Sequence, residues 1–152
     1  HDKVEQLIEE LESDATPKER MTPAFRELAD NLAAHVAMEE ALFYPTVRAK
    51  QTEEILLEST EEHLSIKRVL ADLMHTRISD PRFEAKLAVL KEQIEHHARE
   101  EEEQILFPKL RRLMSSEQLH ALGAEMLALF ERLMSRSPGT HVSKETRKPA
   151  SL

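Results

Sequence analysis

Cysteine is absent from this chain of 152 residues, and glycine occurs only twice. Without cysteine the protein has no disulfide framework, no thiolate metal site and no cysteine nucleophile, although that absence does not fix the cellular compartment. No apolar run approaches the roughly 20 residues that a membrane-spanning helix needs. A basic excess is also lacking, because 29 acidic and 21 basic residues give a formal charge of −8. That balance argues against nucleic acid or an anionic membrane as a partner.

The first residue is histidine rather than methionine. We therefore expect that the chain begins inside a longer natural one or follows processing, and that any targeting peptide would lie upstream of His1. We expect a cytoplasmic protein. The sequence gives no indication of the oligomeric state.

The scarcity of glycine and β-branched residues, beside abundant Glu, Leu, Ala, Lys and Arg, is typical of an all-helical chain. In five segments, apolar residues recur at steps of three and four, the spacing of a helix with one buried face. Residues that favour helix starts are Thr16-Pro17, Thr52, Asp80-Pro81 and Ser115 or Ser116. We predict an all-α, antiparallel up-down-up-down four-helix bundle with a short fifth helix. The bundle domain is expected over residues 1–134, and residues 135–152 have the composition of a flexible C-terminal tail.

Two histidines stand four residues before a glutamate on the apolar face of a predicted helix. In the pairs His35/Glu39 and His97/Glu101, positions i and i+4 share one helix face. These side chains take places that leucine would otherwise fill. Two carboxylates buried in one core would repel each other strongly unless they are protonated or bound to a cation. The two pairs therefore predict a metal site inside the bundle.

Two more histidines lie on the inner faces of the other predicted helices. Taken singly, His1 is more often a solvated terminal residue and His63 a hydrogen-bonded core histidine. Taken together, one histidine on the inner face of every main helix favours metal binding. His96 with Glu100 is a competing pair, and it faces away from the apolar stripe of its helix.

The neighbours of these residues have simpler interpretations. The other acidic residues, Glu40 and Glu100 to Glu103 apart from Glu101, are interpreted as a solvated face. Tyr44 is interpreted as packing at the bundle end, or else as a hydrogen-bond donor near the site. Three apolar residues are predicted to limit water access to the metal: Leu32, Ile66 and Ile94.

Two other metal motifs are missing from the sequence. Ferritin-like di-iron sites use a Glu-x-x-His pair on each of two helices, and this chain has that spacing only once, from Glu117 to His120 in the predicted fifth helix. The His-Glu-x-x-His motif of zinc metalloproteases is also absent. Imidazole and carboxylate ligands suit iron, manganese or zinc.

At these residues the chain resembles the hemerythrin family, in its HHE cation-binding branch, over about residues 1–134. The segments that carry the resemblance are His1–Leu7, His35–Pro45, Glu62–Leu64, His96–Pro108 and Leu122–Met126. The resemblance implies a four-helix bundle that holds two non-haem iron ions, with manganese or zinc as alternatives. By the same resemblance, the ligands are His1, His35, Glu39, His63, His97 and Glu101. Glu39 and Glu101 would be the bridging carboxylates, and an open position on one iron would bind dioxygen, peroxide or nitric oxide.

The chain departs from that family in two places. Oxygen-carrying hemerythrins have two histidines on the third helix, whereas here Ser59 and Lys67 stand one turn either side of His63. This departure argues against reversible oxygen carriage and for an extra open or water-filled position. The stretch from His97 to Pro108 is also one residue longer than that from His35 to Pro45. Either a helical bulge after Glu101 absorbs the extra residue, or His96 is the ligand.

We therefore expect a non-haem di-iron protein that binds, senses or reacts with a small oxidant at a buried His/Glu site. Two alternatives stay open. The chain could be a di-iron oxidase or peroxide-consuming enzyme, or it could be a metal-free helical interaction module.

Overall fold

The computed structural model describes residues 1–146 and 150, and this part of the chain contains helices and no strands. Two long rods each contain a π-helical segment: α2 (Lys18–Met38), η1 (Glu39–Phe43) and α3 (Tyr44–Val47) form one, and α5 (Pro81–Glu95), η2 (His96–Leu106) and α6 (Phe107–Leu113) form the other. The remaining elements are α1 (Asp2–Glu12), α4 (Glu53–Met74), α7 (Ser116–Met134), η3 (Pro138–His141) and α8 (Val142–Glu145). The predicted all-α bundle is confirmed.

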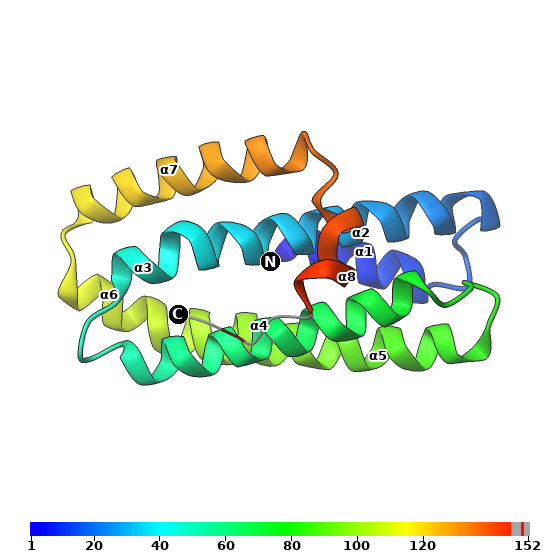
Figure 1. The fold of residues 1–152 in the computed structure, drawn as a ribbon, viewed down its shortest axis with the longest axis horizontal. Coiled ribbons are helices and arrows are strands. Elements are labelled where there is room, and N and C mark those ends of the chain that lie inside the picture. Colours follow the sequence, from blue (N-terminus) through cyan, green and yellow to red (C-terminus); the bar gives the residue numbers. More distant parts are fainter. Residues whose placement is uncertain (147–149, 151–152) are drawn as a thin grey trace.

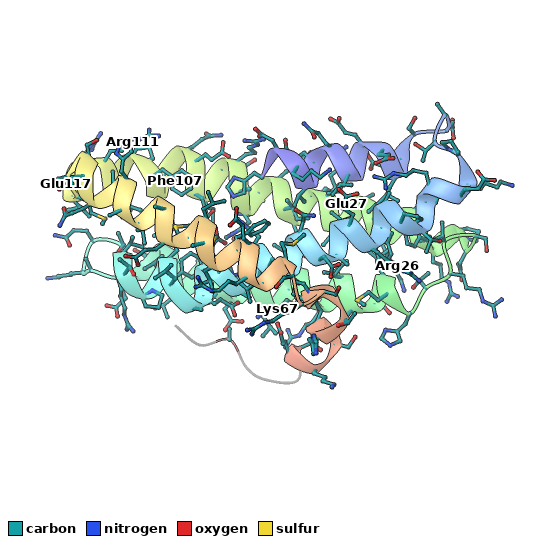
Figure 2. All side chains as sticks on the ribbon, turned by 90° about the horizontal axis from the view of Figure 1, so that it is seen from above. Arg26, Glu27, Lys67, Phe107, Arg111 and Glu117 are labelled. Atoms are coloured by element: carbon teal, nitrogen blue, oxygen red, sulfur yellow. The ribbon has the colours of Figure 1, made fainter. Side chains whose placement is uncertain are left out.

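The two long rods and α4 run side by side along the whole molecule (Figure 1). α1 lies along one half of this three-rod frame and α7 along the other half, as both ribbon views show (Figures 1 and 2). The predicted fifth helix is therefore not short. With 19 residues, α7 is longer than α1, which has 11.

The hydrophobic core is divided into two clusters along the length of the bundle. The larger cluster includes Val36, Ile66 and Ile94, and the smaller one begins at Phe43, Leu56 and Leu106. On each of the three rods, buried polar residues lie between these positions: Glu39 on the first rod, Ser59, Thr60 and His63 on α4, and His97, Glu101 and Glu102 on the third. The apolar clusters therefore enclose a polar layer from both ends.

The structure confirms some of the helix-capping residues that the sequence predicts and contradicts others. Asp80 accepts a hydrogen bond from the backbone of Arg82, and Ser115 forms a capping box with Gln118. The predicted cap at Thr16 is wrong, because its hydroxyl donates to the carbonyl of Glu10 and α2 begins at Lys18. Thr52 precedes α4, but its hydroxyl donates to the carbonyl of Val47 instead of capping the helix.

Each π-helical segment ends two residues before a proline. Pro45 and Pro108 lie at the starts of α3 and α6. Proline has no N–H to donate and its ring clashes with the carbonyl four residues earlier. Widening the preceding turn from i+4 to i+5 bonding moves that carbonyl away without ending the helix. The prolines thus account for the position of both π segments.

The C-terminal region differs from the flexible tail that the sequence predicts. Gly139 donates its backbone N–H to Asp30 at 2.9 Å, and Val142 is completely buried in the larger cluster. η3 and α8 therefore pack on the bundle, while residues 147–149 and 151–152 of the predicted tail lie outside the described residues. Among the described helices, none has the length and apolar character that crossing a membrane requires.

The contact of α8 with the bundle predicts a stability effect. Val142→Ala removes buried methyl groups and should lower the free energy of unfolding by about 1–3 kcal/mol. Val89→Ala is the matched control, because Val89 is 45% exposed, and should change it by less than about 0.5 kcal/mol. Urea unfolding of the metal-free proteins measures both values. Equal effects of the two substitutions would contradict the packing of α8.

Candidate metal centre

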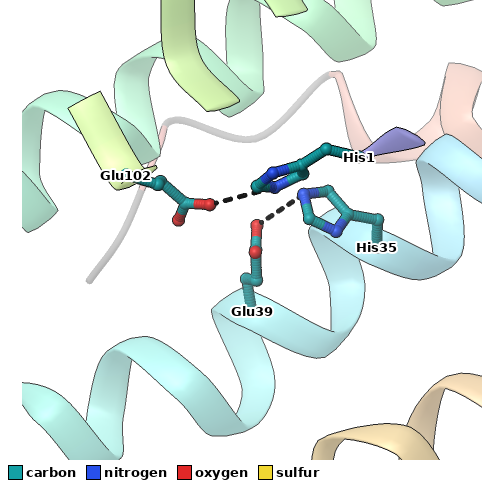
Figure 3. A group of neighbouring side chains, drawn as sticks. All are labelled: His1, His35, Glu39 and Glu102. Atoms are coloured by element: carbon teal, nitrogen blue, oxygen red, sulfur yellow. Dashed lines mark ion pairs between the residues drawn. The ribbon is translucent and has the colours of Figure 1, made fainter. Parts of the chain in front are cut away.

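The polar layer between the two clusters is built around six side chains that converge from four elements of the bundle and from the residue before α1. The members of this central group are His1, His35, Glu39, His63, His97 and Glu102. His1 and His35 are partly exposed, and the other members are at most 2% exposed. Figure 3 shows the carboxylates of Glu39 and Glu102 pointing toward the rings of His1 and His35.

Five of the six residues that the sequence analysis proposed as ligands meet in this group. Glu101 is not among them, and Glu102, which the sequence analysis assigned to a solvated face, is completely buried in its place. The cause is η2, in which i→i+5 bonding turns Glu102 toward the side on which His97 lies. The predicted bulge is therefore present. It begins at His96, before Glu101 rather than after it.

The central group divides into two sets of candidate donor atoms. In the first set, His35 Nε2 lies 3.1 Å from Glu39 Oε2, and His1 Nε2 lies 3.3 Å from Glu102 Oε2. In the second set, His63 Nε2 lies 2.9 Å from His97 Nε2 and 3.2 Å from Glu39 Oε2.

Both carboxylates face both sets. The Oε2 atom of Glu39 lies near histidines of the two sets, as the distances above show. Glu102 directs Oε2 to His1, while its Oε1 atom is 3.9 Å from His97 Nε2. A pair of carboxylates shared in this way suits two neighbouring cations.

The buried carboxylate oxygens and the spacing of the donor atoms fit bound metal ions. Glu39 Oε2 and Glu102 Oε2 are buried without a hydrogen-bond partner within the described chain, although imidazole nitrogens lie within 3.3 Å. Metal–ligand bonds of about 2.0–2.2 Å place neighbouring ligand atoms about 3 Å apart at right angles. The spacing of the donor atoms matches that value. Unpartnered buried oxygens are costly, and a cation would satisfy them.

Outside this group, three carboxylates hold the outer nitrogens of the histidines. The Nδ1–carboxylate pairs are His1 with Glu103 at 2.7 Å, His63 with Glu40 at 3.3 Å and His97 with Glu62 at 2.9 Å. A carboxylate on Nδ1 fixes the orientation of the ring and leaves Nε2 free to bind a metal. Lys67 and Arg99 in turn bind Glu40 and Glu103. Glu40 and Glu103, which the sequence analysis assigned to a solvated face, thus support the histidines.

Glu101 and His96 lie at the periphery. Glu101 forms a separate group with Glu62 and His97, and burial and the neighbouring Glu62 raise the pKa of Glu101 to about 7. His96 is half exposed and its Nδ1 lies 2.9 Å from Glu100. Of the two adjacent histidines, His97 is therefore the one that faces the central group.

Two histidines of the group, His1 and His97, favour the protonated form, whereas burial lowers the pKa of His35 to about 4. Burial lowers the pKa of His1, but the neighbouring carboxylates of Glu102 and Glu103 outweigh it and raise the pKa to about 9. Burial is likewise outweighed at His97, where Glu39 and Glu62 raise the pKa to about 10. Burial opposes ionisation of Glu39, yet the surrounding histidines hold its pKa well below the usual value. The imidazolium protons balance the carboxylates, and a metal ion must displace them.

A cavity of about 70 Å³ adjoins the first set. His1, His35 and His97 contribute to its wall together with Lys3 and Asn31, and the remaining lining is apolar: Val4, Leu32, Val36, Ile66, Ile94, Ala98 and Phe130. A water molecule needs only about 10–15 Å³ by the same measure. The cavity therefore has room for a molecule of a few atoms, and it includes all three apolar neighbours that the sequence analysis predicted.

Residues 1–110 match the family described as hemerythrin HHE cation binding domain. The chain belongs to this family. It is also 30% identical over 139 residues to a protein named DNA nickase from Nostoc sp. (strain PCC 7120 / SAG 25.82 / UTEX 2576), an alignment that covers 91% of this chain. This HHE chain spans 39% of the length of that relative. No solved structure gives a significant match.

The register of η2 predicts which glutamate matters for metal binding. Glu102→Gln should weaken Fe²⁺ binding by about tenfold or more, because it removes a charged donor from the central group. Glu101→Gln is the matched control one residue away and should change the affinity less than about threefold. Equilibrium dialysis with Fe²⁺ under argon measures both. A greater loss of Fe²⁺ affinity in Glu101→Gln than in Glu102→Gln would show that Glu101 faces the metal, as regular α-helical spacing predicts.

Proposed function

We propose that this chain is a di-iron protein in which a buried metal pair binds and reacts with a small oxidant, namely dioxygen, peroxide or nitric oxide. The observation that carries the proposal is the placement of Glu39 in both sets of histidines, with Glu102 directing one oxygen to His1 and the other, at 3.9 Å, to His97. Membership of a cation-binding family supports it. Iron fits imidazole and carboxylate donors, as manganese and zinc also do.

The distribution of donors supports a division of roles between the two positions. The first set offers His1, His35 and the two shared carboxylates, and it adjoins the apolar cavity. When bound, iron supplies redox chemistry and open coordination positions to a small ligand in this cavity. The apolar wall limits the entry of water, and the histidines and their outer carboxylates fix the geometry around the ligand.

The similarity to the Nostoc relative does not point to DNA cleavage by this chain. Only 39% of that protein is matched, and a net charge of −8 disfavours contact with the phosphates of DNA. A peroxide-consuming activity would use the same site as the proposed function. Turnover of hydrogen peroxide by the iron-loaded protein, lost in Glu39→Ala, would assign it.

Metal analysis tests the proposal directly. The purified protein loaded with Fe²⁺ should hold about two irons per chain, and its melting temperature should rise because binding to the folded state adds stability, about 2.7 kcal/mol at a hundredfold excess over Kd. Glu39→Ala or His97→Ala should lose both effects, whereas the control His96→Ala should keep them. A wild-type chain that binds no transition metal would instead support the helical interaction module.

The cavity predicts an effect on small ligands. Ile66→Phe fills part of the cavity, and it should slow the binding of nitric oxide to the iron-loaded protein by about tenfold or more while the iron content stays unchanged. Leu57→Phe on the same helix is the control, since Leu57 is 50% exposed, and it should bind at the wild-type rate. Stopped-flow absorption measures the rates. Equal rates in all three proteins would show that small ligands do not enter through this cavity.

A further inference from the structure

Tyr44 is the only tyrosine of the chain, and its hydroxyl lies inside the second set of donor atoms. The hydroxyl oxygen is 3.0 Å from His63 Nε2, 3.5 Å from His97 Nε2 and 3.2 Å from Glu102 Oε1. These values resemble the separations between the candidate ligand atoms themselves, which begin at 2.9 Å. Unlike an ordinary buried tyrosine, Tyr44 thus directs its oxygen toward the point on which two imidazoles and two carboxylates converge.

Ser59 and Lys67, one turn either side of His63 on α4, do not occupy the position of the Tyr44 hydroxyl. The hydroxyl of Ser59 donates to the carbonyl of Ile55 at 2.8 Å, and Lys67 Nζ binds both oxygens of Glu40. Neither side chain supplies a donor atom beside His63. The second set therefore has one histidine from α4 and one from η2, and the phenol oxygen occupies the next position around them.

Local structure holds the phenol ring in place. Tyr44 is completely buried, and its ring stacks on His63 with centroids 5.2 Å apart and an interplanar angle of 26°. Tyr44 follows Glu39 by five residues, and the π-helix η1 lies between them. An i+5 residue in a regular α-helix would point to a different side, whereas i→i+5 bonding brings both side chains toward the centre. η1 thus turns Tyr44 toward the central group, as η2 turns Glu102 toward it.

We propose that Tyr44 is a ligand of the metal ion held by His63 and His97. This inference rests on the proposed function, and it makes the second position a site with two imidazoles, a phenolate and the shared carboxylates. An iron ion held in this way would have five protein donors, whereas the first position offers four: His1, His35 and the two shared carboxylates. The small oxidant is then directed to the first position, beside the cavity.

Coordination requires the phenol to lose its proton. In the structure the hydroxyl donates to Glu102 Oε1 at 3.2 Å. A bound cation reverses the local charge, and protein ligands give up protons when they bind metals. On metal binding the O–H bond would break, a lone pair of the oxygen would bind the metal, and the proton would be released to solvent.

Spectroscopy of the iron(III) protein tests the proposal, because any phenolate signal must come from the single tyrosine. Protein loaded with Fe²⁺ and oxidised in air should show a visible phenolate-to-iron charge-transfer band, and Raman excitation in that band should enhance phenolate ring vibrations. Tyr44→Phe, which removes only the hydroxyl, should lose the band completely while it keeps bound iron. Ser59→Ala removes a neighbouring buried hydroxyl and should keep the band.

The possible results separate this inference from the proposed function. Wild-type protein that binds iron but shows no phenolate vibrations would overturn the role of Tyr44 as a ligand and leave the di-iron proposal standing. A band that survives in Tyr44→Phe would also overturn it. Wild-type protein that binds no iron would overturn both proposals.

Discussion

The structure depends on placing two carboxylates and four imidazoles in one buried layer of a helical bundle. Buried charge of this kind costs several kcal/mol unless other charges or ligands compensate it. Here imidazolium protons provide the compensation in the absence of a metal, and cations can replace them. The apolar clusters on either side exclude water from the layer and hold the helices together. The same burial that makes the layer costly without partners therefore favours metal binding.

The two π-helical segments decide which side chains enter that layer. Each lies just before the residue that precedes a proline, so that the helix widens where the ring would otherwise meet a carbonyl. The widened turn brings Glu102 beside His97 and Tyr44 beside Glu39. A regular α-helix would present Glu101 instead of Glu102. Proline thus affects the composition of the candidate site from several residues away.

The sequence predicted the helices and most of the central group because both follow from the phase of apolar residues. His35, Glu39, His63 and His97 replace apolar residues at α-helical steps, and the structure brings them together with His1. Glu102 was missed because the same spacing was continued through a π-helix. The extra residue between His97 and Pro108 was the available signal, and it predicted a bulge after Glu101, whereas the π-helix begins before it at His96. Neither the packing of Val142 nor the contacts of Thr16 follow from local spacing, since both depend on partners distant along the chain.

The outer carboxylates explain how the layer can accept cations of high charge. Two divalent ions would bring four positive charges, whereas Glu39 and Glu102 supply only two negative ones. The carboxylates on the Nδ1 atoms of three histidines, Glu40, Glu62 and Glu103, add negative charge one step further out. Lys67 and Arg99 hold two of these carboxylates when no metal is present. The rings and their partners are therefore already oriented before a metal binds, and little reorganisation is needed on binding.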